Sequence, residues 1–171
     1  MQVAIAPTQT ECEEHVPFQL PEQYDVSILS IQHFSLQGGL PDGHRLALNP
    51  MSGTLSYLEW DGEQVRLALQ QQFTNSELSL LLPLLESYPH YCPYEVMYAR
   101  FYNGTVTDVE IARVRRHLRI AMQRGTWEQE MKPVRNVLSR TRAKLQHFGY
   151  TISSILETGY LVRPSRERGL V

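Results

Sequence analysis

The stretch Lys132–Phe148, KPVRNVLSRTRAKLQHF, has the period of an amphipathic helix, and the rest of the chain is interpreted around it. At about 100° per residue, one side of this helix is expected to face the core, and it carries Val134, Val137, Leu138, Thr141, Leu145 and Phe148. Pro133 suits a first helical turn and Gly149 suits a helix stop. The stretch contains no Asp or Glu, so its outer face is expected to bind something negatively charged.

A β-hairpin is predicted directly after this helix. The segment TISSILETGYLV, residues 151–162, has two arms rich in β-forming residues around Glu157-Thr158-Gly159. A helix followed by a hairpin is the order of a recognition helix and its wing, so the remaining chain is interpreted as the support for that pair.

Charge is distributed unevenly along the 171 residues, although the formal net charge is only −2. Residues 1–100 hold three Lys or Arg against twelve Asp or Glu, whereas residues 101–171 hold thirteen against six. Such a split favours a basic working face for nucleic acid over a membrane-binding surface. The alternative is chance clustering of cations on solvated helices.

The length predicts one domain, and the cysteine content indicates a reducing compartment. Two cysteines, Cys12 and Cys92, do not make a disulfide framework. No signal-peptide pattern and no apolar stretch of about 18 residues occurs in the sequence. We therefore expect a soluble, cytoplasmic protein.

The first half of the chain is predicted to hold an acidic arm and an antiparallel sheet. Residues 1–23 lack periodicity and are expected to form a flexible acidic arm. Residues 24–72 should form a sheet of about four strands, with strands at 26–34 and 45–48. The clearest hairpin joins 54–60 to 63–69 through Asp61-Gly62.

Three further helices are predicted between the sheet and the basic helix. The capping boxes Thr74–Glu77 and Thr107–Glu110 open helices that end near Ser87 and Arg124. Pro83 should bend or shorten the first, and Pro93 opens a short helix over 94–102. The expected buried stripes are Leu78, Leu81, Leu82 and Leu85 in the first helix, and Ile111, Val114, Leu118, Ala121 and Met122 in the third.

Three segments in this order resemble the OmpR/PhoB-type winged-helix DNA-binding domain. They are FTNSELSLLLPLLESYP (73–89), PYEVMYARFYNG (93–104) and VRNVLSRTRAKLQHFGYTISSILETGYLVRP (134–164). The ending ISSILETGYLV matches the family's strand–turn–GY ending closely, and the likeness covers about two thirds of the chain.

The resemblance implies an α+β winged helix-turn-helix over residues 24–164. It would comprise an N-terminal antiparallel sheet, three core helices, an inserted helix at 107–124 and a C-terminal hairpin wing, with a basic tail at 165–171. The fifty residues before Met51 are too few for the receiver domain that many members carry, so no phosphoacceptor switch is expected within this chain.

Departures from the family pattern limit what is carried over. The family usually has an acid at Arg135 and an apolar residue at Asn136, so the base preference does not transfer. The wing has Leu156 and Glu157 where the family often has an Arg, which disfavours minor-groove contact by the wing tip. The helix at 107–124 stands where a short loop is normal.

DNA recognition needs cations for phosphates and polar side chains for base edges. Asn136 is expected to pair with adenine and Arg140 with guanine, the alternative being a solvated helix face. Ser139 supplies a short donor or acceptor, while Ser154 lies near the DNA backbone by resemblance. Phosphate contacts are expected from Lys132, Arg135, Arg142 and Lys144, with Arg113 and Arg116 of the inserted helix assisting. No catalytic constellation, metal site or cofactor is predicted.

Several alternatives stay open at this stage. Three roles are open for the inserted helix: to widen the DNA footprint, to form a dimer seam through its apolar stripe, or to pack on its own core. The arginines 163, 166 and 168 either follow a DNA groove or keep the end soluble. Cys12-x-x-His15 with His90-x-Cys92 has metal-ligand composition, but coincidence is the favoured interpretation.

The resulting functional prediction is a sequence-specific duplex-DNA-binding transcriptional regulator. Its expected partners are double-stranded DNA, a second copy as a homodimer, and RNA polymerase or another regulator. The alternative is a winged-helix module for protein–protein contact, such as an adaptor of the transcription machinery. The acidic first half and the acidic wing tip favour that alternative.

Overall fold

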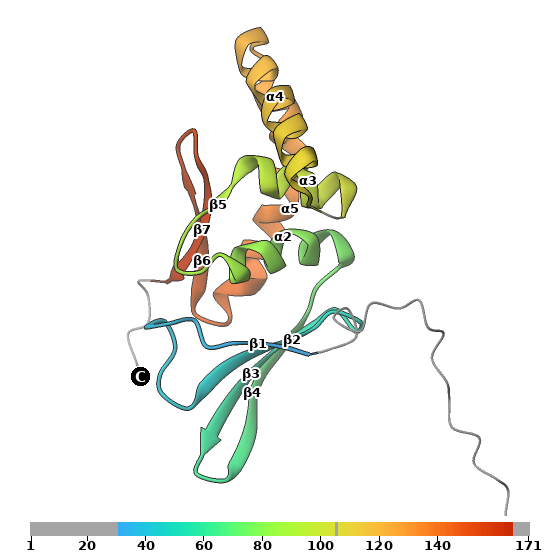
Figure 1. Ribbon diagram of the computed structural model, residues 1–171. Helices are drawn as coiled ribbons and strands as arrows, with labels where there is room; N and C mark the ends of the chain where they lie inside the picture. The colour runs from blue at the N-terminus through green and yellow to red at the C-terminus, as the bar shows by residue number, and fades with distance from the viewer. Residues whose placement is uncertain (1–30, 105, 166–171) are drawn as a thin grey trace, which may run out of the picture.

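The computed structural model describes residues 31–104 and 106–165 (Figure 1). Over these residues the chain is α+β, as expected, with a four-stranded antiparallel sheet, four helices and a smaller three-stranded sheet. The predicted arm at 1–23, most of the strand predicted at 26–34, and Arg166 and Arg168 lie outside the described residues. No helix in the described part is long and apolar enough to cross a membrane.

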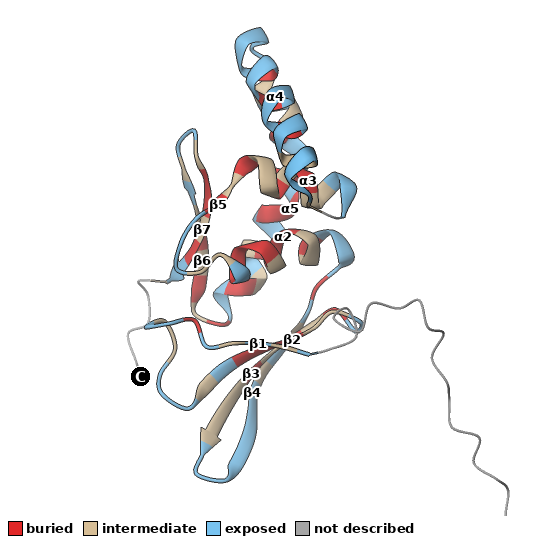
Figure 2. Ribbon diagram, in the orientation of Figure 1, coloured by how far each residue is buried: buried red, intermediate tan, exposed pale blue. Residues whose placement is uncertain are grey.

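The four-stranded sheet has the order β1-β2-β3-β4, with β1 Gln32–Phe34, β2 His44–Asn49, β3 Thr54–Asp61 and β4 Gln64–Gln72. The hairpin predicted at Asp61-Gly62 is confirmed, and Gly62 takes the positive φ of 61° that such a turn favours. Leu46, Leu48 and Leu55 are fully buried on the face toward the helices. Most of β4 is exposed, and the β3–β4 hairpin projects away from the helices (Figures 1 and 2).

Helices α2 Asn75–Glu86, α3 Tyr94–Asn103 and α4 Asp108–Arg124 begin where their sequence signals predict. Both capping boxes form, because the Thr side chain accepts from the Glu backbone N–H and the Glu carboxylate accepts from the Thr backbone N–H. Pro83 lies inside α2, which continues to Glu86 rather than ending at the proline. The fully buried leucines of α2 include Leu80 and Leu84, whereas the predicted Leu78 and Leu82 are only half-buried.

Helix α5 Trp127–Gln146 begins five residues before the predicted start. Pro133 is therefore inside the helix, and the prediction that it lies in the first turn is wrong. Two apolar side chains explain the extension: Met131 is fully buried, and the Trp127 ring lies 5.2 Å from that of Tyr94. All six residues predicted to face the core are buried: Val134, Val137, Leu138, Thr141, Leu145 and Phe148.

The hairpin after α5 forms as predicted, from β6 Tyr150–Ile155 and β7 Gly159–Pro164. A short strand, β5 Cys92–Pro93, pairs with β7 and gives the order β5-β7-β6. A Cβ added at Gly159 would lie 2.1 Å from the Cys92 carbonyl oxygen, so only glycine permits this close approach. The hairpin, called the wing below, rises beside α5 (Figure 1).

One hydrophobic core joins the sheet, α2, α3, α5 and the wing. Helix α2 lies between the four-stranded sheet and the other helices, and α4 projects with the first half of α5 beyond α3 (Figure 1). Figure 2 shows that buried residues concentrate in α2, α5 and the inner face of the wing, whereas the outer face of α4 is exposed. Helix α5 and the wing are thus packed on the same core as the four-stranded sheet.

Candidate nucleic-acid interface

The outer face of α5 is exposed and mostly polar. Lys132, Asn136, Ser139, Arg140 and Ala143 are all exposed there, opposite the buried stripe. No acidic residue occurs in α5 after Glu130. The burial of Val134, Leu138 and Leu145 fixes the rotation of the helix, so the residues predicted to face outward are exposed to solvent.

A hollow of about 390 Å³ separates α5 from the wing. Three residues predicted from the sequence, Arg135, Arg142 and Ser154, meet at this hollow. The Arg142 Nε donates to the Ile152 carbonyl oxygen at 2.8 Å, which anchors the guanidinium to β6. The remaining lining comes from Tyr94, Leu138, Leu156 and Tyr160. The arrangement therefore offers two guanidinium groups and a hydroxyl at one place between the helix and the wing.

Glu128 is a site residue that the sequence analysis missed. Its carboxylate binds both terminal nitrogens of Arg135, one of them at 3.1 Å, and its side chain is 73% exposed. This hydrogen bonding raises the pKa of Arg135 above its ordinary value. A sequence signal existed, because Trp127 and Met131 continue the buried stripe seven and three residues before Val134.

Lys144 is half-buried and its ammonium is held within the chain, which argues against the phosphate contact predicted for it. Its ammonium donates to the Glu77 carboxylate at 2.7 Å and to the Gln72 carbonyl oxygen at 2.9 Å. It also lies 5.2 Å from the centre of the Phe73 ring. Glu77 is only 2% exposed, so this ion pair fastens α5 to the start of α2.

Burial acts to raise the pKa of Glu77, but hydrogen bonds from Lys144 and Thr74 outweigh it and lower the pKa overall. The carboxylate is therefore charged in the folded protein at neutral pH. Arg140 is 62% exposed, with its Nε 3.9 Å from the other oxygen of Glu77. Arg140 is therefore paired with Glu77 only through a long contact at Nε, and most of its side chain is exposed on α5.

The apolar stripe of α4 is packed within the chain. Val114, Leu118 and Ala121 are buried, Ile111 is half-buried, and only Met122 of the predicted stripe is exposed. The predicted dimer seam through this stripe is therefore not available in the folded protein, because its central residues already contact the chain's own core. A homodimer would need another surface.

Three polar side chains join α4 to α3 and α5. The Glu130 carboxylate lies 3.1 Å from the His117 Nε2 and accepts from the Tyr98 hydroxyl at 3.1 Å. Burial and the bond to Glu130 raise the pKa of Tyr98 to about 12. Arg113 and Arg116 are exposed on the same helix, so α4 presents cations to solvent while its other side is fixed.

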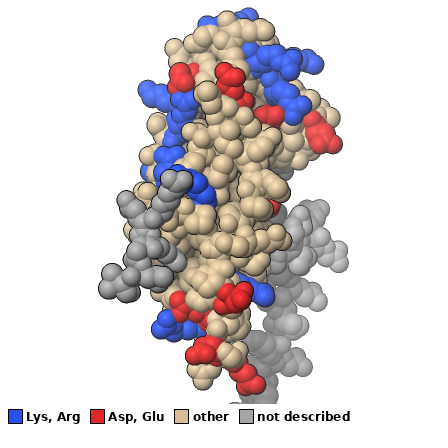
Figure 3. All heavy atoms as spheres, turned by 90° about the vertical axis from the view of Figure 1, so that its left-hand side faces the viewer, with Lys and Arg blue, Asp and Glu red and all other residues tan. Residues whose placement is uncertain are grey.

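The wing tip differs from the rest of this surface. Leu156 is 85% exposed, and Glu157 follows it with a φ of 55°. Figure 3 shows the face on the wing side: Lys and Arg gather at its upper end, where α4, α5 and the wing lie, with Asp and Glu among them. The middle of this face is largely uncharged (Figure 3). On this face most Lys and Arg therefore lie toward the helical end, and a few lie at the opposite end beside Asp and Glu (Figure 3).

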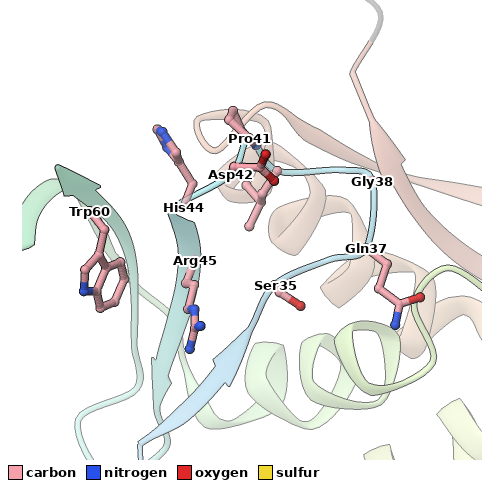
Figure 4. A pocket seen from close by; sticks show the side chains of 10 residues that line it. Ser35, Gln37, Gly38, Pro41, Asp42, His44, Arg45 and Trp60 are labelled. Carbon is pink, nitrogen blue, oxygen red and sulfur yellow. The ribbon is translucent and has the colours of Figure 1, made fainter. Parts of the chain in front are cut away.

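A second hollow, of about 400 Å³, lies between the β1–β2 loop and the end of β3. Figure 4 shows that its labelled side chains point in different directions. The Arg45 guanidinium carbon lies 5.6 Å from the centre of the Trp60 ring. Cys92 is buried, which raises the pKa of its thiol to about 12, and no group of three metal-binding side chains occurs in residues 31–104 and 106–165. Cys12 and His15 of the considered metal set lie outside the described residues.

Comparison with known proteins identifies no family for this chain. No protein-family model matches the sequence, and no curated protein matches it.

Proposed function

We propose that the protein is a winged-helix, sequence-specific DNA-binding regulator of transcription, with α5 as its recognition helix. The observation that carries this proposal is the exposed face of α5, which has no acidic residue after Glu130, next to a hollow that holds Arg135, Arg142 and Ser154. An α-helix with such a face fits the major groove, and cations beside it are suited to the flanking phosphates.

The roles of the residues follow from their positions. Asn136, Ser139 and Arg140 lie on the outermost face of α5 and are assigned to base edges. Lys132, Arg135 and Arg142 are assigned to phosphates, with the Ser154 hydroxyl beside them on the wing. Arg113 and Arg116 of α4 are assigned to more distant phosphates, and Lys144 is left out because its ammonium is already held.

The order of elements supports the OmpR/PhoB-type resemblance as part of this proposal. A four-stranded antiparallel sheet precedes the helices, a short strand pairs with the wing, and the hairpin follows α5 directly. Helix α4 remains an insertion between α3 and α5. Regulation of transcription rests on this resemblance together with the DNA-binding surface.

The direct test is a salt titration of binding to a random-sequence duplex of about 25 base pairs. Five or six phosphate contacts should give a log–log slope of about −5 between 50 and 200 mM salt. Selection from a random duplex library would then identify the preferred sequence. Absence of binding at 50 mM salt would reject the proposal.

A second function is favoured by the wing tip. An exposed Leu156 followed by Glu157 suits contact with another protein better than contact with a phosphate backbone. In this alternative the protein is an adaptor of the transcription machinery. It predicts no appreciable duplex binding at 50 mM salt, and a Leu156→Ser variant that loses the protein partner while remaining folded.

A further inference from the structure

The hollow between α5 and the wing contains one guanidinium that is anchored and one that is already paired. Arg142 is held at its Nε by the Ile152 carbonyl oxygen, which leaves its terminal nitrogens for another acceptor. Arg135, two helical turns earlier, is paired through both terminal nitrogens with Glu128. Among the ion pairs of the described residues, none involves Arg142.

The Glu128 carboxylate has the geometry that a phosphate would need at Arg135. A carboxylate and a phosphate both accept two parallel N–H bonds from one guanidinium, so they compete for the same donors. Glu128 is 73% exposed and Arg135 is 39% exposed, which makes this a surface ion pair. Such pairs contribute little to stability, so exchange of one acceptor for another is feasible.

We propose that this hollow is a binding site for a phosphodiester, and that Glu128, which lines the neighbouring hollow with Lys132 and Asn136, holds the Arg135 guanidinium until a phosphate replaces it. This inference rests on the proposed DNA-binding function and adds a regulating residue to it. Arg142 makes the first contact because its guanidinium is already oriented. Arg135 then exchanges its carboxylate for a phosphate oxygen, and Glu128 moves into solvent.

The proposal has a definite electrostatic consequence. In the free protein Glu128 cancels one cation at the site, and in the complex it stands near the phosphate that displaced it. Both effects weaken binding to every duplex, whatever its sequence. Glu128 therefore lowers the sequence-independent part of the affinity. A larger share of the total affinity must then come from base contacts.

The test compares Glu128→Gln with Glu130→Gln in the full-length protein. Both variants remove one negative charge from the first turn of α5, but Glu130 faces His117 and Tyr98 rather than the hollow. We expect Glu128→Gln to bind a random duplex about fivefold more tightly at 50 mM salt and to steepen the salt slope by up to about one unit. Glu130→Gln should change binding by less than about twofold.

A double-mutant cycle with Arg135→Ala assigns the effect to the ion pair. Glu128→Gln should strengthen binding much less when Arg135 is absent, because there is then no guanidinium to release. Equal effects of Glu128→Gln with and without Arg135, or equal effects of the two glutamine variants, would overturn the proposal. Thermal unfolding verifies that each variant is folded.

Three other outcomes can be distinguished from one another. Weaker binding by Glu128→Gln together with lost preference for cytosine at one position would make Glu128 a base contact, which also overturns the proposed role of Glu128. If the unmodified protein binds no duplex and Glu128→Gln does not confer binding, the proposed function itself fails. If the unmodified protein binds with a steep slope but Glu128→Gln binds no better, only this further inference fails.

Discussion

Arg140 is the side chain that best distinguishes base contact from phosphate contact. It projects from the outer face of α5 and is 62% exposed. We expect Arg140→Ala to weaken binding to the selected sequence by about 1–3 kcal/mol and to relax preference at one base position. Arg45→Ala, which removes an exposed arginine from the four-stranded sheet, is the control. Equal loss on selected and random duplexes would reassign Arg140 to a phosphate.

Gly159 stands where β7 approaches β5 too closely for any larger residue. An alanine Cβ there would lie 2.1 Å from a backbone oxygen of β5, and neither strand can move without breaking the pairing. Gly159→Ala should lower the free energy of unfolding by about 3 kcal/mol. Gly125→Ala is the control, because its φ is 70° but nothing lies within 4 Å, and it should cost about 1 kcal/mol. Urea unfolding measures both, and similar values for the two variants would contradict the β5–β7 contact.

Glu77 makes stability depend on pH. Because its pKa is lowered on folding from an ordinary 4.5, its contribution is present above about pH 4.5 and is lost as the pH falls through the folded value. We expect Glu77→Gln to cost about 1.5–3 kcal/mol at pH 7, and progressively less below pH 4.5. Urea unfolding at several pH values provides the comparison. A cost that stays constant down to pH 3 would show that the charge contributes nothing.

The same residues show what could not be predicted from the sequence. Periodicity placed Asn136, Ser139 and Arg140 outside because the stripe opposite them is long and regular. Lys144 was assigned to phosphate because its partner Glu77 is 67 residues earlier in the chain, and such a separation leaves no local pattern. Glu77 itself was recognised only as a capping residue, which describes half of its role.

Helix starts were predictable where the first turn carries its own signal. The capping boxes at Thr74 and Thr107 marked α2 and α4 correctly, because both partners lie within four residues. Thr126 precedes α5 without a side-chain capping bond, so its true start depends on the tertiary contacts of Trp127 and Met131. The missing first turn also contained Glu128, and the site was therefore predicted as more basic than it is.

Packing of α4 against α3 and α5 leads to a prediction at the scale of the element. Leu118 is only 4% exposed, so Leu118→Asp should place a carboxylate in the core and destabilise the protein by more than about 3 kcal/mol. Ile120→Asp, on the exposed side of the same helix, should cost less than about 1 kcal/mol. Thermal unfolding separates the two variants. If the parent protein is a dimer and Leu118→Asp gives a stable monomer, the apolar stripe of α4 is a dimer interface after all.

At the scale of the whole molecule, charge and architecture divide the protein in the same way. The four-stranded sheet belongs to the acidic half of the sequence, whereas α4, α5 and the wing belong to the basic half. Composition therefore predicted which end of the molecule carries the candidate interface. It did not predict that one helix would connect the two ends.

Helix α5 is held by polar side-chain contacts at both of its ends. It has 20 residues and so a length of about 30 Å. One end is fastened to α2 by Glu77 and Lys144, and the other to α3 and α4 by Glu130 with His117 and Tyr98. A displacement of α5 near the wing should then move the helix as a unit, including its end at the four-stranded sheet. Its amides from Val134 to Leu145 should exchange hydrogen with one common opening free energy, and graded protection along the helix would show that it bends instead.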